Sequence, residues 1–544
     1  MQNGIAVVPK AVNEPIKDYR PGSPERASLQ RKLAELKQGE IEIPLIIGGK
    51  EVRTGRLGEC RIPHDHGHVL ARYHQAGPAE IQQAIAASQE AWQEWSRTPW
   101  EDRVAIFRRM AVLLAGPYRD LLNGATMLGQ SKTVFQAEID SACELIDFFN
   151  FNTQYMAEIY AQQPQYHPTG TWNQLEYRPL EGFIFAVTPF NFTSIAGNLP
   201  TSPAMMGNVV LWKPASSAVY SAYYLMQLFR EAGLPDGVIN FIPGPGSQVG
   251  PTVLEHPLLA GIHFTGSTEV FQDMWRRVGA NIKQYRNYPR IVGETGGKDF
   301  VFVHESADLD ATVTALVRGA FEYQGQKCSA ASRAYIPDTI WPKFKERFVE
   351  TVRTIKMGPT EDFTNFMGAV IDRAAFNSIK SYIDYAAASS EAEIITGGKC
   401  DDSVGYYIEP TTIVTTNPRF KTMEEEIFGP VLTIYVYPAP EYEATLHLCD
   451  QTSPYALTGS IFALDRQAVI KAREILTHAA GNFYINDKPT GAVVGQQPFG
   501  GGRASGTNDK AGSWLNLIRW VSVRTIKENF LPPRDYRYPH MEED

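Results

Sequence analysis

Gly325-Gln326-Lys327-Cys328-Ser329-Ala330 is the stretch around which the chain is organised. It follows a run from Asp308 to Tyr323 whose apolar residues recur at helical spacing, which predicts an amphipathic helix. Asp308 is the predicted N-cap of that helix, and Gly325 ends it. Cys328 is therefore expected on a loop just past a helix end, where a thiol can meet a substrate. An isolated cysteine is more often a buried, small hydrophobic residue, so the neighbouring motifs must show whether Cys328 has a catalytic role.

A second motif, Gly293-Glu294-Thr295-Gly296-Gly297-Lys298, lies about thirty residues upstream. A glutamate in a Gly-rich turn before an apolar strand, predicted at Phe300–Val303, suits a general base that must move. The two motifs at this spacing are far more specific than either alone, and together they resemble the aldehyde dehydrogenase superfamily. The resemblance implies that Cys328 is the nucleophile and that Glu294 activates water.

Composition places the chain among ordinary globular proteins, with 544 residues, 43% apolar and 20% charged, and room for about three domains or subdomains. The net charge of -9 is spread out, so no basic patch for nucleic acid or a membrane surface is expected. The five cysteines are scattered, without metal-ligand spacing or a disulfide framework, so we expect no metal and a reducing compartment. No targeting segment or membrane span is recognised. A cytoplasmic protein is expected, or a mitochondrial matrix protein if the source is eukaryotic.

Residues 1–42 are predicted to form an N-terminal extension with one helix. Ser23 caps that helix, and its apolar stripe of Leu29, Leu33 and Leu36 is expected to pack on the protein's own surface. A helical stretch follows from about 78 to 160. The segment 169–182 is bounded by glycine and is predicted as a hairpin arm.

Short apolar strands then alternate with helices, which predicts an α/β fold with a parallel, doubly wound sheet. A second alternating region runs from about 300 to 487. The predicted strands are Phe183–Val187, Val209–Trp212, Val238–Ile242 and Ile262–Phe264 in the first region, and Val431–Val436, Ser460–Ala463 and Asn482–Ile485 in the second.

The superfamily resemblance implies an aldehyde dehydrogenase fold with a Rossmann-like cofactor domain, an α/β catalytic domain and a β oligomerisation flap. It assigns 43–168 and 183–293 to the dinucleotide-binding domain and 294–510 to the catalytic domain. The flap and tail are 169–182 and 511–544. The flap implies a homodimer or a higher homo-oligomer.

One glycine motif is interpreted as a turn rather than as a cofactor site. Gly244-Pro-Gly246-Ser-Gln-Val-Gly250 follows a strand, but its spacing is one residue too long for the dinucleotide fingerprint. The favoured candidate is Phe264 to Val270, where a strand enters a helix and small residues let backbone amides approach a pyrophosphate. Phe271 follows, where many superfamily members have glycine. The candidate contacts there are Gly266, Ser267, Thr268, Glu269 and Val270.

Other stretches resemble further parts of the superfamily's site. Asn191, in Val187-Thr188-Pro189-Phe190-Asn191-Phe192, would complete the oxyanion hole, although an isolated asparagine there also suits a turn. Thr188 lies in the same loop and is a candidate cofactor contact. Lys213 matches the lysine that holds the adenosine ribose. Three residues later Ser216 replaces an acidic residue often found in NAD-selective members. NAD is the implied cofactor, with NADP less favoured.

The nicotinamide end of the cofactor is assigned to a Glu-rich stretch. Glu426 and Phe428, in Glu424-Glu425-Glu426-Ile427-Phe428-Gly429-Pro430, match the motif that holds the nicotinamide ribose. A Glu-rich run alone is usually a solvated face. Phe-Gly-Pro leading into a strand argues against that alternative here.

Several stretches narrow the resemblance to superfamily members that oxidise L-glutamate γ-semialdehyde to L-glutamate in proline degradation, through a cysteine thiohemiacetal and thioester. The stand-alone form is implied, with a functional link to a separate proline dehydrogenase. Substrate contacts are assigned to Phe192, Ser329, Gly491, Ala492 and Phe499, with a plain turn at Gly491-Ala492 as the alternative. Two other functions stay open: another semialdehyde dehydrogenase, such as one for succinic semialdehyde, and a non-catalytic dinucleotide-binding scaffold. The stretches are 189–193, 321–330, 481–488, 495–501 and 503–510.

Overall fold

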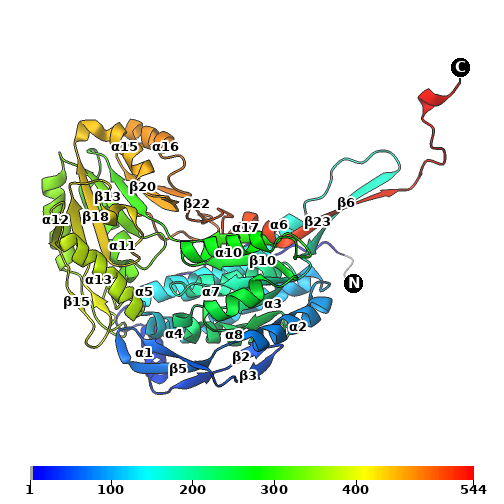
Figure 1. Ribbon diagram of the computed structural model, residues 1–544, viewed down its shortest axis with the longest axis horizontal. Coiled ribbons are helices and arrows are strands. Elements are labelled where there is room, and N and C mark those ends of the chain that lie inside the picture. Colours follow the sequence, from blue (N-terminus) through cyan, green and yellow to red (C-terminus); the bar gives the residue numbers. More distant parts are fainter. Residues whose placement is uncertain (1–3, 544) are drawn as a thin grey trace.

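The first sheet contains the predicted parallel strands in the order β11-β10-β7-β8-β9-β2-β3. Its strands β10, β2 and β3 are labelled in Figure 1. The computed structural model describes residues 4–543. Strands β7 to β11 run parallel, and the hairpin β2–β3 closes one edge in the antiparallel sense. The strands are β2 (Leu45–Ile47), β3 (Lys50–Val52), β7 (Phe183–Val187), β8 (Val209–Lys213), β9 (Ile239–Phe241), β10 (Leu259–Thr265) and β11 (Arg290–Glu294).

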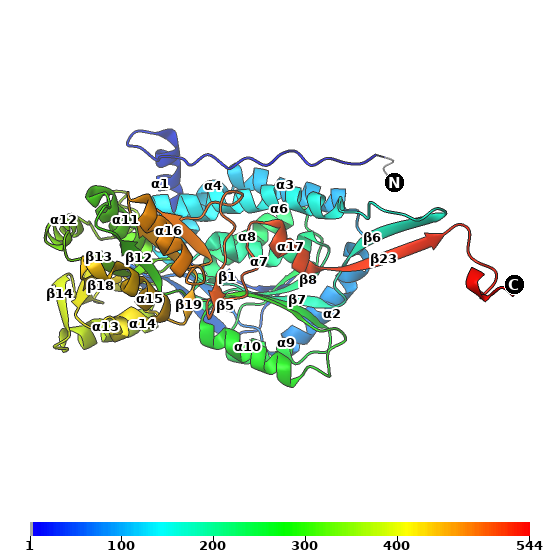
Figure 2. The same cartoon turned by 90° about the horizontal axis from the view of Figure 1, so that it is seen from above.

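Helices cover both faces of this sheet, as a parallel sheet of apolar strands requires (Figure 2). One face carries α2, α9 and α10. The other carries α7 and α8, backed by α3, α4 and α6. Their bounds are α2 (Pro78–Trp95), α3 (Trp100–Ala115), α4 (Arg119–Gln130), α6 (Leu145–Tyr160), α7 (Thr193–Met205), α8 (Val219–Glu231), α9 (Gly246–Leu254) and α10 (Thr268–Ala280). Between α4 and α6 lie α5 (Val134–Ala137) and a π-helix, Glu138–Glu144.

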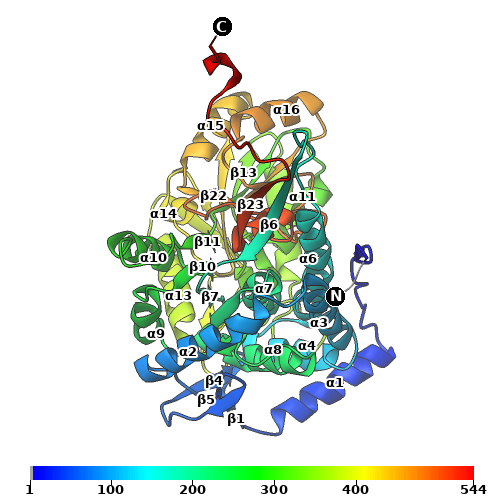
Figure 3. The ribbon, with the colours of Figure 1, turned by 90° about the vertical axis from the view of Figure 1, so that its right-hand side faces the viewer.

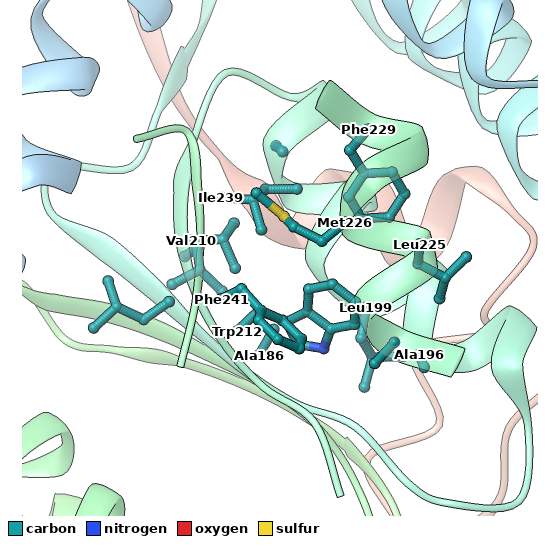
Figure 4. Packing of buried hydrophobic residues seen from close by; sticks show 14 of the residues in the cluster. Ala186, Ala196, Leu199, Val210, Trp212, Leu225, Met226, Phe229, Ile239 and Phe241 are labelled. Atoms are coloured by element: carbon teal, nitrogen blue, oxygen red, sulfur yellow. The ribbon is translucent and has the colours of Figure 1, made fainter. Parts of the chain in front are cut away.

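Trp212 on β8 is the centre of the packing between the sheet and α7–α8 (Figure 4). Its fully buried ring lies 5.9 Å from the ring of Phe229 on α8 and 5.2 Å from that of Phe241 on β9. The indole N–H donates to Thr188 Oγ1 at 3.0 Å, which satisfies the one polar atom of the side chain. The core therefore reaches directly beneath the loop after β7.

The second unit is a sheet with the order β14-β17-β18-β13-β12-β20-β21, parallel except for β14 at one edge. Its two faces form separate hydrophobic clusters, one under α11–α12 and one under α13, α15 and α16. The strands are β12 (Asp299–Val303), β13 (Ala331–Pro337), β14 (Ala392–Thr396), β17 (Thr411–Thr415), β18 (Val431–Tyr437), β20 (Thr458–Phe462) and β21 (Asn482–Ile485). The helices are α11 (Leu309–Phe321), α12 (Trp341–Arg353), α13 (Arg373–Ala387), α14 (Lys421–Glu424), α15 (Tyr442–Gln451) and α16 (Arg466–Ile475).

A two-stranded ribbon projects from the first unit (Figures 1 and 2). It pairs β6 (Thr171–Pro179) with β23 (Val521–Asn529) in the antiparallel sense. The prediction of a hairpin within 169–182 was therefore wrong, because this segment is one strand and its partner comes from near the C-terminus. No local turn pattern identifies a partner so distant in the sequence.

The N-terminal extension contains the predicted helix, α1 (Pro24–Lys37). Ser23 Oγ accepts the Arg26 backbone N–H at 3.3 Å, and the predicted leucine stripe is buried against the first unit. Residues 4–20 form no helix or strand and run along the outside of the first unit (Figures 2 and 3). None of the helices within residues 4–543 is long and apolar enough to cross a membrane.

Smaller elements complete the chain. They are β1 (Ile41–Ile43) with β4 (Leu57–Ile62) and β5 (Asp65–His74), the pair β15 (Cys400–Asp401) and β16 (Tyr407–Ile408), the pair β19 (Tyr455–Ala456) and β22 (Gly502–Arg503), and α17 (Trp514–Leu517).

Candidate active site

Cys328 follows a tight turn at the end of α11, as the sequence predicts. Asp308 caps α11 by accepting the Ala311 N–H at 2.9 Å, and a 3₁₀ turn at Glu322–Gly325 leads away from the helix. Tyr323, Gln324 and Gly325 all have left-handed φ values, of 52°, 55° and 65°. Two of these are not glycine, so the turn is strained and must be held by its surroundings.

The side chain of Gln324 holds this turn. Its Nε2 donates to the carbonyl oxygens of Ser131 and Ala369 at 3.0 and 2.7 Å, and its Oε1 accepts the Gly368 N–H at 3.0 Å. Gln324 is 1% exposed, so these bonds form out of water. The turn is thereby fixed to both α/β units at once, and it presents Cys328 at their junction.

Glu294 lies beside the thiol. It is the last residue of β11 rather than part of a free turn, and its Oε1 accepts a hydrogen bond from Cys328 Sγ at 3.3 Å. Desolvation raises the pKa of Glu294 to about 7, against the smaller opposing effects of the Cys328 hydrogen bond and the Lys510 charge. Burial, and then the Glu294 charge, raise the pKa of Cys328 well above its usual value. The carboxylate form of Glu294 and the thiolate form of Cys328 are thus both disfavoured. The two side chains are suited to exchanging one proton.

Asn191 lies close to the same turn. It follows β7, and its Nδ2 donates to the carbonyl oxygen of Gln326, two residues before Cys328, at 3.0 Å. Asn191 and Cys328 both line a cavity of about 1100 Å³. The amide is therefore positioned to meet an oxygen on a carbon that the thiol attacks.

This large cavity brings together every residue that the sequence assigned to the cofactor. It runs from Cys328 past the strand ends of the first sheet to the first turns of α9 and α10. The predicted residues in its lining are Thr188, Lys213, Gly266, Ser267, Thr268, Glu269, Val270, Glu426 and Phe428.

The polar groups of the cavity fit a dinucleotide. Ser267 is the N-cap of α10, and the helix N-terminus favours an anion such as a pyrophosphate. Lys213 is 8% exposed, and its Nζ makes a single hydrogen bond, to the Pro214 carbonyl at 3.2 Å, which leaves donors for ribose hydroxyls. Burial lowers the pKa of Lys213 to about 8. Glu426 is held by the backbone N–H groups of Gly297 and Phe428, at 2.8 and 3.2 Å.

The interpretation of Gly244–Gly250 as a turn was wrong. Helix α9 begins at Gly246, and Gly246, Ser247 and Gly250 line the large cavity. A Cβ on Gly246 would lie 3.8 Å from Lys213 Cε, an ordinary contact distance, so the N-terminus of α9 lies close to the lysine. The spacing test rejected the dinucleotide fingerprint, but it could not exclude a helix that starts inside the motif.

The predicted substrate residues do not line the large cavity, and they do not share one cavity. Ser329 Oγ lies 2.7 Å from Thr490 Oγ1, which joins the residue after Cys328 to the loop carrying Gly491 and Ala492. Gly491 has φ +91°, so this turn requires glycine. Phe499 lines a small cavity of about 60 Å³ together with Glu294. Phe192 packs instead on Lys132, whose Nζ lies 3.9 Å from the ring centroid.

Glu144 was missed by the sequence reasoning. It ends the π-helix and lines the small cavity with Glu294 and Phe499. Ser194 Oγ donates to Glu144 Oε2 at 3.0 Å, and desolvation, then the Asp140 charge, raise the pKa of Glu144 to about 8. The apolar spacing of 78–160 predicts regular helix, and a π-helical insertion shifts the face on which a side chain lies without any sequence signal.

Another missed feature is the buried pair Lys132–Asp140, whose Nζ and Oδ2 are 2.7 Å apart. The Asp140 carboxylate also accepts the backbone N–H groups of Thr193 and Ser194 at 3.0 and 2.8 Å. Asp140 thus caps the N-terminus of α7, which begins at Thr193, two residues after Asn191. Within the described part of the chain, no cluster of three or more histidine, cysteine or acidic side chains is arranged to hold a metal ion.

Comparison with known proteins matches residues 53–526 to the aldehyde dehydrogenase family. The chain is 55% identical over 538 residues to the mitochondrial delta-1-pyrroline-5-carboxylate dehydrogenase of Dictyostelium discoideum, covering 98% of this chain and 96% of that protein. The crystal structure of the Mycobacterium tuberculosis delta-pyrroline-5-carboxylate dehydrogenase bound with NAD is 50% identical, with a TM-score of 0.96 and full coverage of both chains. Proline utilization A from Bdellovibrio bacteriovorus is 30% identical, with a TM-score of 0.91 over 96% of this chain and 54% of that one.

Proposed function

The chain belongs to the aldehyde dehydrogenase family, and from this premise we propose that it oxidises L-glutamate γ-semialdehyde, the open form of delta-1-pyrroline-5-carboxylate, to L-glutamate with NAD. The observation that carries the proposal is the position of Cys328. Its thiol lies 3.3 Å from Glu294 Oε1 and beside Asn191, at one end of a cavity with the size and polar groups for a dinucleotide. A nucleophile, a base and an oxyanion donor thus meet at the cofactor.

The proposed mechanism begins with the thiol. The thiolate form of Cys328 attacks the aldehyde carbon. The developing oxyanion accepts a hydrogen bond from Asn191 Nδ2. When bound, NAD supplies the acceptor for the hydride that leaves this carbon. Cys328 then holds the acyl group as a thioester, and Glu294 removes a proton from the water that releases the carboxylate. Overall, aldehyde, water and NAD⁺ become carboxylate, NADH and two protons.

The charged end of the substrate is assigned to the loop beside Ser329. Gly491 and Ala492 expose backbone N–H groups with almost no side chain in front of them, which suits a carboxylate. The substrate's ammonium group is assigned to Glu144, whose carboxyl group lines the small cavity with Glu294. A bound cation would lower the pKa of Glu144 and favour its charged form. Phe192 and Phe499 are the proposed flanks of the aliphatic stem.

The two alternatives fit the structure less well. Succinic semialdehyde carries a carboxylate but no amino group, so it would leave the Glu144 carboxyl group in the small cavity without a cation to pair with. A dinucleotide-binding scaffold needs neither a thiol nor a base, whereas Cys328 and Glu294 are in direct contact. The direct contact between Cys328 and Glu294 therefore favours a catalytic function over a dinucleotide-binding scaffold.

Partners and location are proposed on the same basis. The ribbon β6–β23 is the proposed contact of a homodimer or higher homo-oligomer. The match to about half of proline utilization A supports a functional link with a separate proline dehydrogenase. The proposed compartment is the cytoplasm for a bacterial source and the mitochondrial matrix for a eukaryotic one.

The experiment compares three aldehydes by NADH formation. We expect kcat/KM for L-glutamate γ-semialdehyde to exceed that for succinic semialdehyde by at least about tenfold, the scale of one lost charged contact. Ala492→Leu should raise KM for L-glutamate γ-semialdehyde strongly and affect propanal much less. Equal kcat/KM for the two semialdehydes would overturn the substrate assignment, and equal losses for both aldehydes in Ala492→Leu would overturn the carboxylate anchor.

A further inference from the structure

The N-terminal strap, defined as residues 11–19, crosses the helix that borders the small cavity. It runs antiparallel to α6 and to the π-helix before it, and its backbone N–H groups donate to side chains of those helices. These hydrogen bonds are Ala11 N to Gln154 Oε1 at 3.0 Å, Glu14 N to Asp147 Oδ1 at 2.7 Å and Lys17 N to Glu138 Oε1 at 2.9 Å. The strap therefore passes directly over the turns that carry Glu144 and Phe148, both of which line the small cavity.

The side chain of Asn13 forms hydrogen bonds with the loop that follows β21 in the second unit. Its Nδ2 donates to Asp147 Oδ2 and to the carbonyl oxygen of Val494, both at 2.8 Å. Its Oδ1 accepts from Gln496 Nε2 at 3.0 Å. Three of the four hydrogen bonds that an asparagine amide can make are thus formed, and they join the strap, α6 and the loop.

The loop segment that Asn13 holds continues directly from the proposed substrate anchor. Val494 lies two residues after Ala492 and is 6% exposed. Gly495 has φ +82°, and a Cβ there would lie 2.2 Å from Phe151 of α6, so the backbone of the loop lies against this helix. The contacts with α6 and Asn13 therefore fix this end of the loop, whereas Thr490 fixes its other end through Ser329.

We propose that the strap, through Asn13, is a positioning element that sets the enzyme's selectivity for aldehydes with a charged carboxylate and ammonium end. This inference rests on the proposed function, because it assigns the loop 490–496 to the substrate. Asn13 fixes the end of the loop relative to α6, which begins directly after Glu144. Loss of this link lets the carboxylate anchor move relative to the ammonium site, while Cys328 and the cofactor cavity are untouched.

The other contacts of the strap show how the positioning role of Asn13 can be separated from the role of the strap as a cover for α6. Arg119 pairs with Glu14 at 2.6 Å, and Tyr19 OH donates to Glu138 Oε2 at 2.9 Å. These contacts attach the strap to the first unit and persist when Asn13 is changed. A substitution at Asn13 therefore releases the loop without detaching the strap.

The test uses the full-length enzyme with Asn13→Ala and Asn13→Asp, with Val12→Ala as the control. Asn13→Asp keeps the shape but removes both donors and places a carboxylate against Asp147. Val12 is 74% exposed and adjoins Asn13.

In both Asn13 variants we expect KM for L-glutamate γ-semialdehyde to rise about tenfold, the effect of one or two lost hydrogen bonds. The kcat/KM for propanal and the Kd for NAD should stay within about twofold. Val12→Ala should match the parent enzyme.

Either of two results would overturn the inference. One is an unchanged KM for L-glutamate γ-semialdehyde in both Asn13 variants. The other is an equal loss of kcat/KM for propanal, which would mean that the substitution loosens the enzyme generally. Failure of the proposed function gives a different result, because the parent enzyme would then show no preference for L-glutamate γ-semialdehyde over succinic semialdehyde.

Discussion

Burial is the main factor that sets the protonation states of Cys328 and Glu294 in the free enzyme. Desolvation raises the pKa of the Glu294 carboxyl to about 7 and raises that of the thiol as well. A base is most useful when its pKa lies near the working pH, since it is then both available and able to release the proton again. Glu294 satisfies this condition because it is shielded from water.

The pH dependence of kcat should report the ionisation of Glu294, because this base acts in the deacylation step that releases the product. The carboxylate is the active form, and its pKa is raised to about 7, so activity is lost as the pH falls through this value. We expect roughly a tenfold drop for each pH unit below about 7. Propanal is the substrate of choice, because its own charge does not change with pH. A flat profile between about pH 5 and 7 would remove Glu294 as the base.

The grouping of the three proposed catalytic residues could be predicted from the sequence, whereas their roles stay predictions. Cys328, Glu294 and Asn191 were named from local motifs, and the structure brings them together around the turn at Glu322–Gly325. Glu144 could not be found from the sequence, because its position depends on the π-helix. Asn13 could not be found either, because its partners are 134 and 481 residues away along the chain.

The end of β11, which carries Glu294, is fixed by a close fit with α10. A Cβ on Gly293 would lie 2.2 Å from Phe271 Cε2. The Phe271 ring is stacked on that of Phe264, with centroids 5.2 Å apart, so it cannot simply move aside. Phe271 is absent from the cavity lining and instead fills the space that Gly293 leaves open. Phe271 therefore follows the small-residue motif because its ring packs between α10 and the strands β10 and β11.

Gly293→Ala should therefore both destabilise the protein and reduce activity. Overpacking of this kind costs about 1–3 kcal/mol, and displacement of β11 moves Glu294 away from Cys328. Phe271→Leu introduced into the same chain should restore part of both losses, because the ring that the new methyl group meets is removed. Thermal unfolding and NADH formation measure the two effects.

Gly279 provides the matched control for this substitution. It lies in α10, where an added Cβ would meet nothing within 4 Å. Gly279→Ala should leave activity unchanged and raise stability by up to about 1 kcal/mol. If Gly293→Ala behaved like Gly279→Ala, the close fit between Gly293 and Phe271 would not constrain β11.

Elements with a strong local pattern were predicted closely. Phe183–Val187 and Asn482–Ile485 were predicted to the residue as β7 and β21, because each is a short apolar run of strand-forming residues. The elements at α9 and β6 were not. Helix α9 begins within a glycine motif that also suits a turn, and β6 is stabilised by a partner about 350 residues away. Long-range pairing is set by the whole fold and leaves no local signal.

At the scale of the whole molecule, the ribbon β6–β23 is a pair of strands that no third strand within the described residues joins. It extends away from both sheets (Figure 2), and Trp172 and Val523 on it are 50% and 45% exposed. A lone two-stranded ribbon is marginally stable in water. The ribbon is therefore expected to pack against a second copy of the chain.

Charge placed on the ribbon should break this assembly. We expect the parent enzyme to be at least a dimer by light scattering at micromolar concentration, and the double variant Trp172→Lys, Val523→Lys to shift toward the monomer. Val112→Lys is the control, since Val112 is 71% exposed on α3, away from the ribbon. A monomeric parent enzyme, or a double variant with unchanged mass, would contradict the assignment of the ribbon.

The central claim is that Cys328 forms an acyl intermediate that Glu294 resolves, with L-glutamate γ-semialdehyde as the substrate. Its most direct test is the mass of the Glu294→Gln variant, mixed with NAD and this aldehyde and then quenched in acid. Acid keeps the substrate's amino group protonated, so that it cannot attack the thioester. We predict one γ-glutamyl group per chain, located on Cys328 by peptide mapping, with about one NADH formed per site. An unmodified chain, or an acyl group on another residue, would contradict the account.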